Sequence, residues 1–162
     1  MFLFSVLAAL LLATPVTGND PIPKSVPVSL NKTVMLQLVN KVRQSGCQCG
    51  DTYYNGVAPL KWNEKLEAAA YSHSADMYQK GYFSHTAPDG SRAGQRIERE
   101  GYSWKAYGEN IGTGYKTEKA VVEGWLASPM HCKNIMNRLY TEMGAARVGT
   151  LWTQAFAAPL AP

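Results

Sequence analysis

The order of two hydrophobic patterns along the chain limits its fold more than any other feature of the sequence. Val34, Leu38 and Val42 recur at helical spacing. Residues 63–81 repeat this periodicity between a capping Asn and a final Gly. Residues 142–159 (EMGAARVGTLWTQAFAAP) alternate instead around a Gly-Thr pair, which predicts a β-hairpin. Helices followed by paired strands indicate an α+β domain, with helices stacked on a small antiparallel sheet.

Shorter segments complete the predicted elements. We expect a short helix at residues 95–100 and another at 119–127. Pro129 ends the second of these and can itself occupy the first turn of a further short helix. The segment at 107–115 (YGENIGTGY) is rich in glycine, so we expect it to be irregular or extended.

The N-terminal region differs in composition from the rest of the chain. Phe2 to Val16 is almost wholly apolar, which fits the core of a signal peptide better than a bilayer span of about 20 residues. We therefore predict a signal peptide at residues 1–18. No Lys or Arg precedes the apolar core, so an uncleaved anchor is the alternative. Residues 19–30 contain three prolines and are expected to form an extended linker before a single domain at 31–162.

Composition excludes several classes of protein. The 162 residues correspond to about one domain after removal of a targeting segment. The 16 Lys and Arg and 12 Asp and Glu give a net charge of +4, but the basic residues are scattered, so we expect no nucleic-acid partner. No later apolar run is long enough for a membrane span. We expect a secreted monomer with no span after signal cleavage.

Three cysteines fit an oxidising compartment. Cys47 and Cys49 are too close in sequence to pair comfortably, which favours one long-range bridge to Cys132 and one free thiol. The spacing alone leaves open which of the two pairs with Cys132. Closing so long a loop stabilises the fold by about 4 kcal/mol in the chain-entropy model. A zinc finger is the rival interpretation, but Cys-x-Cys with one distant Cys lacks the usual ligand spacing.

No zinc-protease, nucleophile-elbow, nucleotide-binding or EF-hand motif is present. The remaining candidates are the three histidines and one acid. His73 lies on the apolar stripe of the second helix, where a packed core role is favoured. His85 lies in a loop, His131 lies at a helix start, and Glu109 is surrounded by uncharged, glycine-rich sequence. Taken singly, none of them is specific for a function.

Together, these residues belong to a series of short motifs that is specific. The series is HSADMYQKGYFSHTAPDG at 73–90, R-x-x-x-x-GY from Arg96, GENI at 108–111, WLASPMHCKNIM from Trp125, and then TEMG and WTQAF. It resembles the CAP superfamily of cysteine-rich secretory, antigen 5 and pathogenesis-related proteins, in its bacterial SCP-like form. The resemblance covers about residues 33–158 and implies a three-layer α-β-α sandwich.

The resemblance also implies a site. Two His and two Glu line a cleft in eukaryotic members of the superfamily, and His85, Glu109 and His131 match three of these positions. Ser128 stands where the second Glu is expected. Two imidazoles and a carboxylate suffice for weak binding of Zn²⁺ or another divalent cation, with His85 and His131 as the candidate ligands. His73 matches a position that packs in the family.

The resemblance favours one of the two possible disulfides. Cys132 matches a cysteine that follows the second family His, and Cys49 matches the cysteine of a Cys-Gly pair that precedes the second helix. The implied bridge is therefore Cys49–Cys132, with Cys47 free.

Three functions are consistent with the sequence. The first is a secreted SCP-like module, non-catalytic or weakly catalytic, that binds a small ligand or a divalent cation and needs no cofactor. Its partner would be a small ligand, a lipid or a component of an extracellular surface. The alternatives are a secreted hydrolase acting on peptide or cell-wall polymer, and a lipid- or sterol-binding carrier.

Overall fold

The computed structural model describes residues 30–160. The predicted signal peptide and residues 19–29 of the predicted linker lie outside the described residues. The helices are α1 (Lys32–Ser45), α2 (Glu64–Lys80), α3 (Ala93–Arg99), α4 (Glu118–Ala127) and α5 (Pro129–Ile135). The strands are β1 (Cys47–Cys49), β2 (Thr52–Tyr54), β3 (Lys61–Trp62), β4 (Trp104–Thr113), β5 (Glu142–Val148) and β6 (Leu151–Pro159).

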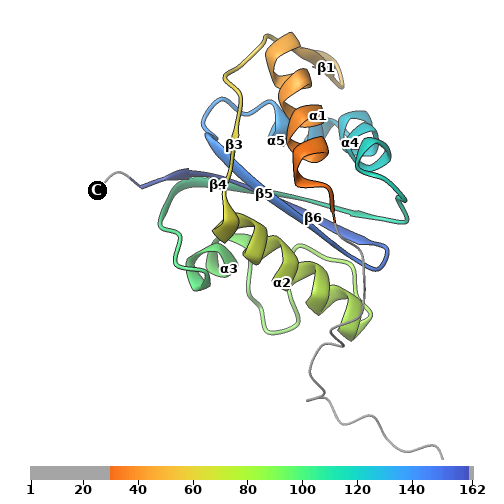
Figure 1. Cartoon of the computed structure of the whole chain (residues 1–162), viewed down its shortest axis with the longest axis vertical. Helices are drawn as coiled ribbons and strands as arrows, with labels where there is room; N and C mark the ends of the chain where they lie inside the picture. Colours follow the sequence, from red (N-terminus) through yellow and green to blue (C-terminus); the bar gives the residue numbers. More distant parts are fainter. Residues whose placement is uncertain (1–29, 161–162) are drawn as a thin grey trace, which may run out of the picture.

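The elements form three layers, as expected for an α-β-α sandwich of the α+β class. The central sheet has the strand order β3-β5-β6-β4, with α2 and α3 on one face and α1, α4 and α5 on the other (Figure 1). The hairpin β5–β6 is present as predicted. The sheet is antiparallel except for the pairing of β3 with β5, which is parallel. A second, two-stranded sheet joins β1 and β2.

Local sequence signals explain where the two longest helices begin and end. The Asn31 side chain accepts a hydrogen bond from the backbone of α1, and Asn63 does the same for α2. Gly46 follows α1 with φ of 75°, and Gly81 follows α2 in the left-handed conformation. The predicted helices are therefore confirmed to within a residue or two.

Residues 107–113 of the glycine-rich segment lie in strand β4, which pairs with β6 with one irregularity between Trp104 and Ala106. Its glycines leave room for side chains from the α1, α4 and α5 face. A side chain at Gly108 would meet the ring of Tyr140, and one at Gly112 would meet Val121 and Trp125. The segment is therefore extended, one of the two forms expected, and its glycines serve close packing.

The core lies on both faces of the sheet. Trp125, Trp152 and Phe156 are fully buried on the side of α1, α4 and α5. On the other side, Leu66 packs against small residues of the sheet such as Ala155. Small side chains on β5 and β6 allow α2 to lie close to the sheet, which matters for the candidate site because α2 contributes a buried histidine.

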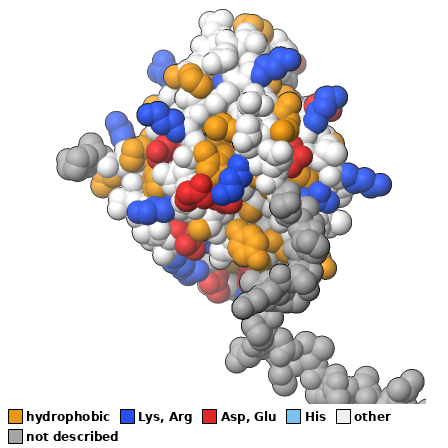
Figure 2. Space-filling view, viewed as in Figure 1, with side chains coloured by type: hydrophobic (Ala, Val, Ile, Leu, Met, Phe, Trp, Pro, Cys, Tyr) orange, Lys and Arg blue, Asp and Glu red, His pale blue; other side chains and the backbone are white. Residues whose placement is uncertain are grey.

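The surface shows no stretch of one charge on the face that carries α1 and α2. Lys and Arg alternate there with Asp and Glu among hydrophobic and uncharged side chains (Figure 2). Within residues 30–160, no helix has both the length and the hydrophobicity to cross a bilayer.

Candidate functional site

A histidine and a carboxylate from distant parts of the chain are in direct contact. His85 lies in the loop between α2 and α3, and Glu109 lies in the middle of β4. His85 Nδ1 is 2.8 Å from Glu109 Oε1. The His85 side chain is 53% exposed, whereas that of Glu109 is only 6% exposed. The carboxylate is thus buried at the base of the pair, and the imidazole extends outward from it.

Arg96 of α3 binds the other oxygen of the same carboxylate. Its Nη2 donates to Glu109 Oε2 at 2.7 Å, and both side chains are 6% exposed. The guanidinium also donates to the backbone carbonyls of Ser91 and His85, at 2.9 and 3.0 Å. Arg96 therefore holds the loop that carries His85 against the carboxylate that orients its ring.

These contacts fix the tautomer of His85 when the ring is neutral. Glu109, ionised beside Arg96, can only accept hydrogen bonds, so His85 Nδ1 carries the proton. The lone pair is then on Nε2, the ring nitrogen that Glu109 does not bind. Both carboxylate oxygens already have a partner, so Glu109 is placed to orient His85. A carboxylate behind a histidine in this way is the usual support for a metal-binding or proton-accepting imidazole.

His73 packs behind this pair, as its place on the apolar stripe predicts. The residue is 0% exposed on α2, and its Nε2 lies 2.9 Å from the carbonyl oxygen of Ser84. The same nitrogen lies 3.9 Å from Glu109 Oε1. Burial lowers the pKa of His73, partly offset by the Glu109 charge. His73 is therefore a neutral, buried neighbour of the carboxylate at neutral pH.

His131 approaches from the opposite layer. It lies near the start of α5, and its carbonyl oxygen accepts a hydrogen bond from Asn110, the residue after Glu109. Burial lowers the pKa of His131, and the neighbouring His85 lowers it further by charge repulsion. The two imidazoles therefore lie within electrostatic reach of each other.

A cavity of about 380 Å³ adjoins the His85–Glu109 pair. Its lining residues are His85, Thr86, Arg92, Ala93, Tyr107 and Glu109. His131 is not among them. Ser128, where the resemblance implies a second acid, lies between α4 and α5 and starts the helix that carries His131.

The three candidate residues do not form a compact ligand set. We searched residues 30–160 for groups of at least three His, Cys, Asp or Glu whose ligand atoms lie within 4.8 Å of one another. One such group is present, and it consists of Cys47, Cys49 and Cys132. Two of these sulfurs are bonded to each other, since Cys49 and Cys132 form a disulfide with a Cα–Cα distance of 5.4 Å. This is the pairing that the resemblance implies, and Cys47 is free.

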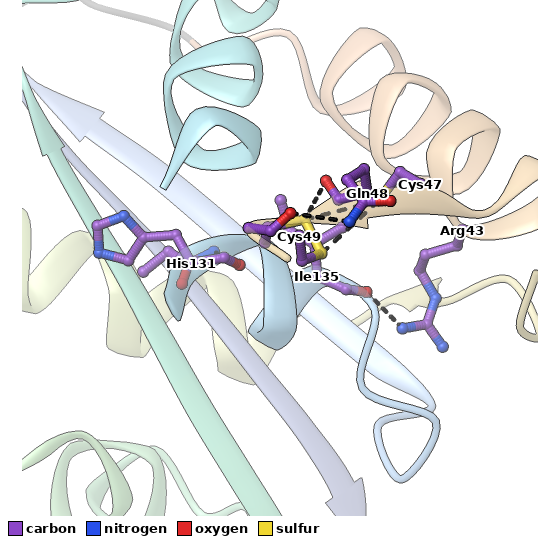
Figure 3. Close-up of a disulfide and its surroundings, with 9 residues drawn as sticks. Arg43, Cys47, Gln48, Cys49, His131 and Ile135 are labelled. Carbon is purple, nitrogen blue, oxygen red and sulfur yellow. Dashed lines mark hydrogen bonds between the residues drawn. A yellow bond between two sulfur atoms is a disulfide. The ribbon is translucent and has the colours of Figure 1, made fainter. Parts of the chain in front are cut away.

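The disulfide connects the β1–β2 hairpin to α5. In Figure 3 the His131 ring points away from the bridge although the residue is next to Cys132. The covalent link therefore fixes the helix that carries His131 and leaves the imidazole itself clear of the sulfurs.

Comparison with known proteins identifies the family. The model of the cysteine-rich secretory protein family, CAP, matches residues 36–154. The chain belongs to the CAP family. It is 37% identical over 131 residues to the uncharacterized protein YkwD of Bacillus subtilis (strain 168), which covers 80% of this chain and 48% of that protein. It is 31% identical over 145 residues to the uncharacterized membrane protein YlbC of the same organism, covering 90% of this chain and 39% of YlbC.

A solved structure shares the fold. An extracellular protein containing an SCP domain, from Bacillus anthracis str. Ames, superposes with a TM-score of 0.70 at 29% identity. The match covers 78% of this chain and 40% of that one. The chain thus spans less than half the length of these relatives.

The sequence analysis assigned no role to several polar residues that build this site. Arg96 was named only as the first residue of the R-x-x-x-x-GY motif, with no function assigned to its side chain. Asn110 and Asn134 link β4 to α5, since the Asn134 amide donates to Asn110 Oδ1 at 2.9 Å and to the Glu109 carbonyl at 3.0 Å. Asn110 is 0% exposed. A buried arginine and a buried asparagine need polar partners. Neither residue lies in an apolar run, so the sequence did not mark them as buried.

Proposed function

We propose that this CAP protein is exported and that it binds a small ligand or a divalent cation at His85, with little or no catalytic turnover. One observation carries the proposal: His85 is half exposed beside a cavity while its Nδ1 is bonded to a buried, ionised Glu109. A neutral imidazole held in this way presents the lone pair of Nε2 to a ligand.

The donor set favours weak binding of a cation such as Zn²⁺. A structural zinc site uses four protein ligands and a catalytic one uses three. Here the side chains that remain are His85 and His131, because both oxygens of Glu109 are engaged and the family's second acid is replaced by Ser128. Two imidazoles would bind Zn²⁺ with water or an anionic ligand completing its coordination.

Export is supported by the sequence of residues 1–18 and by the extracellular SCP-domain relative. The Cys49–Cys132 disulfide adds support, because such bonds persist in oxidising compartments. N-terminal sequencing of protein recovered from the culture medium tests this part of the proposal. A mature N-terminus after Gly18 is expected, whereas protein retained in the membrane with an intact N-terminus would contradict export.

Binding is tested by titration calorimetry with Zn²⁺ on the purified, disulfide-containing protein. We expect His85→Ala to abolish measurable binding and Glu109→Gln to weaken it about 10- to 100-fold, because the amide orients the imidazole less well. His131→Ala should weaken binding as well. Lys105→Ala, on an exposed part of β4, is the matched control and should leave binding unchanged. Equal affinity of the wild type and the His85→Ala variant for Zn²⁺ would show that the cation does not bind at His85, and would contradict the proposal.

Hydrolysis is the second candidate, because a carboxylate-bound imidazole beside a cavity is also the arrangement of a general base. The substrate would be a peptide or a cell-wall polymer. This candidate predicts turnover that is lost in Glu109→Gln while the circular dichroism spectrum is unchanged. A panel of peptide, ester and glycan substrates with equal rates for both proteins would count against it.

A further inference from the structure

Three sulfur atoms meet between β1 and α5, on the side of α5 away from the His131 ring (Figure 3). The free Cys47 Sγ lies 3.6 Å from Cys132 Sγ and 3.8 Å from Cys49 Sγ. Cys49 and Cys132 are 1% and 0% exposed, whereas Cys47 is half-buried. A free thiol is therefore in contact with both sulfurs of a buried disulfide.

The strand geometry explains why the cysteines meet. Cys47 and Cys49 are two residues apart on β1, and side chains at this spacing point to the same face of a strand. That face is turned toward α5, where Cys132 is buried in the core. Either thiol of β1 is thus placed to bond with the same partner.

We infer that Cys47 is the internal nucleophile of a thiol–disulfide exchange site, in which Cys47 and Cys49 alternate as the partner of Cys132. The Cys47 thiol first gives its proton to solvent. Its thiolate then bonds to Cys132 Sγ while the Cys49–Cys132 bond breaks, and Cys49 leaves as a thiolate that takes a proton from solvent. The reaction conserves the number of disulfides and thiols, so it needs no external oxidant or reductant.

Attack on Cys132 is favoured over attack on Cys49. A bridge between Cys47 and Cys49 would join residues whose Cα atoms are about 6.6 Å apart along a strand, near the upper limit for a disulfide. It would also release α5 from the hairpin. Exchange at Cys132 keeps α5 tethered to β1 in both isomers.

The position and environment of Cys47 limit the rate. Its sulfur is nearly equidistant from the two bonded sulfurs and so lies beside their bond, and in-line attack on Cys132 requires the Cys47 side chain to rotate. Burial also raises the pKa of the Cys47 thiol. Because the thiolate is the attacking species, exchange should be slow at neutral pH and faster in alkaline solution.

Alkylation of the purified, oxidised protein tests the inference. The wild-type protein is incubated at pH 6 or pH 9, treated with N-ethylmaleimide without denaturant, and mapped by mass spectrometry after digestion at acid pH. At pH 6 we expect the label on Cys47. After incubation at pH 9 we expect it on both Cys47 and Cys49, with Cys47–Cys132 and Cys49–Cys132 peptides present together. The inference is wrong if no Cys47–Cys132 peptide is found after prolonged incubation at pH 9.

Two further measurements distinguish internal exchange from its alternatives. The rate at which Cys49 becomes labelled should not depend on protein concentration; a proportional dependence would indicate exchange between molecules and overturn the inference. The Cys47→Ser variant should show no free thiol. In the Cys49→Ser variant, folded in the presence of oxidised glutathione, we expect a Cys47–Cys132 disulfide. Recovery of this variant in folded form with Cys47 and Cys132 unbridged would also overturn it.

Discussion

At the scale of single residues, the candidate site depends on a nearly buried ion pair. Arg96 and Glu109 compensate each other's charge, and Arg96 also binds two carbonyl groups of the loop that carries His85. Removing one partner of such a pair leaves a buried charge uncompensated. We expect Arg96→Met to lower the free energy of unfolding by about 3 kcal/mol, measured by urea denaturation. Arg99→Met, which breaks only the exposed pair with Asp89, should change it by less than about 1 kcal/mol. Equal stability of the two variants would contradict this account.

For the same residues, the sequence predicted some roles and missed others. His73 was expected to pack, and it does. The motif series singled out His85 and Glu109, which are in contact, and His131, which lies apart from their cavity. The role of Arg96 was not predicted, because periodicity places a residue on a helix face but does not identify its charge partner. That partner lies 13 residues away on another element.

At the scale of elements, length decided what could be predicted. Helices α1 and α2 and the β5–β6 hairpin have enough residues to show a periodicity, and a capping Asn and a final Gly mark the ends of both helices. Strands β1, β2 and β3 have only two or three residues, so no alternation was detectable. Strand β4 was harder still to predict, because the glycines that make room for Trp125 of α4 and for Tyr140 of the α5–β5 loop weaken its strand pattern.

The close approach of α2 to β5 leads to a prediction about stability. A methyl group added at Gly144 of β5 would overlap the backbone of α2 at Leu66 and Glu67, which a change of side-chain rotamer cannot relieve. We expect Gly144→Ala to lower the free energy of unfolding by about 2 kcal/mol, measured by urea denaturation. Lys105→Ala, at an exposed position of β4, should stay within about 0.5 kcal/mol of the wild type. If Gly144→Ala unfolds at the same urea concentration as the wild type, α2 can move away from β5 at little cost in free energy, and the prediction is wrong.

At the scale of the whole molecule, two histidines link stability to pH. Burial lowers the pKa of His73 and of His131 below the ordinary value of 6.5. The unfolded chain therefore binds more protons than the folded one when the pH falls below about 6.5. Stability should then decrease with falling pH, by at most about 1.4 kcal/mol per pH unit for each histidine. Ser91 holds the pKa of Asp89 at about 2, so the stability that this acid contributes is lost only at much lower pH.

Urea denaturation at intervals from pH 7.5 to pH 5 measures this dependence. We expect the free energy of unfolding to fall over this range in the wild type and to fall less steeply in His73→Gln. The glutamine can still donate a hydrogen bond to the Ser84 carbonyl but has no proton to gain. His131→Gln should reduce the slope independently, because His131 lies on α5, in the layer opposite α2. A wild-type slope that persists in the double variant would assign the pH dependence to carboxylates instead.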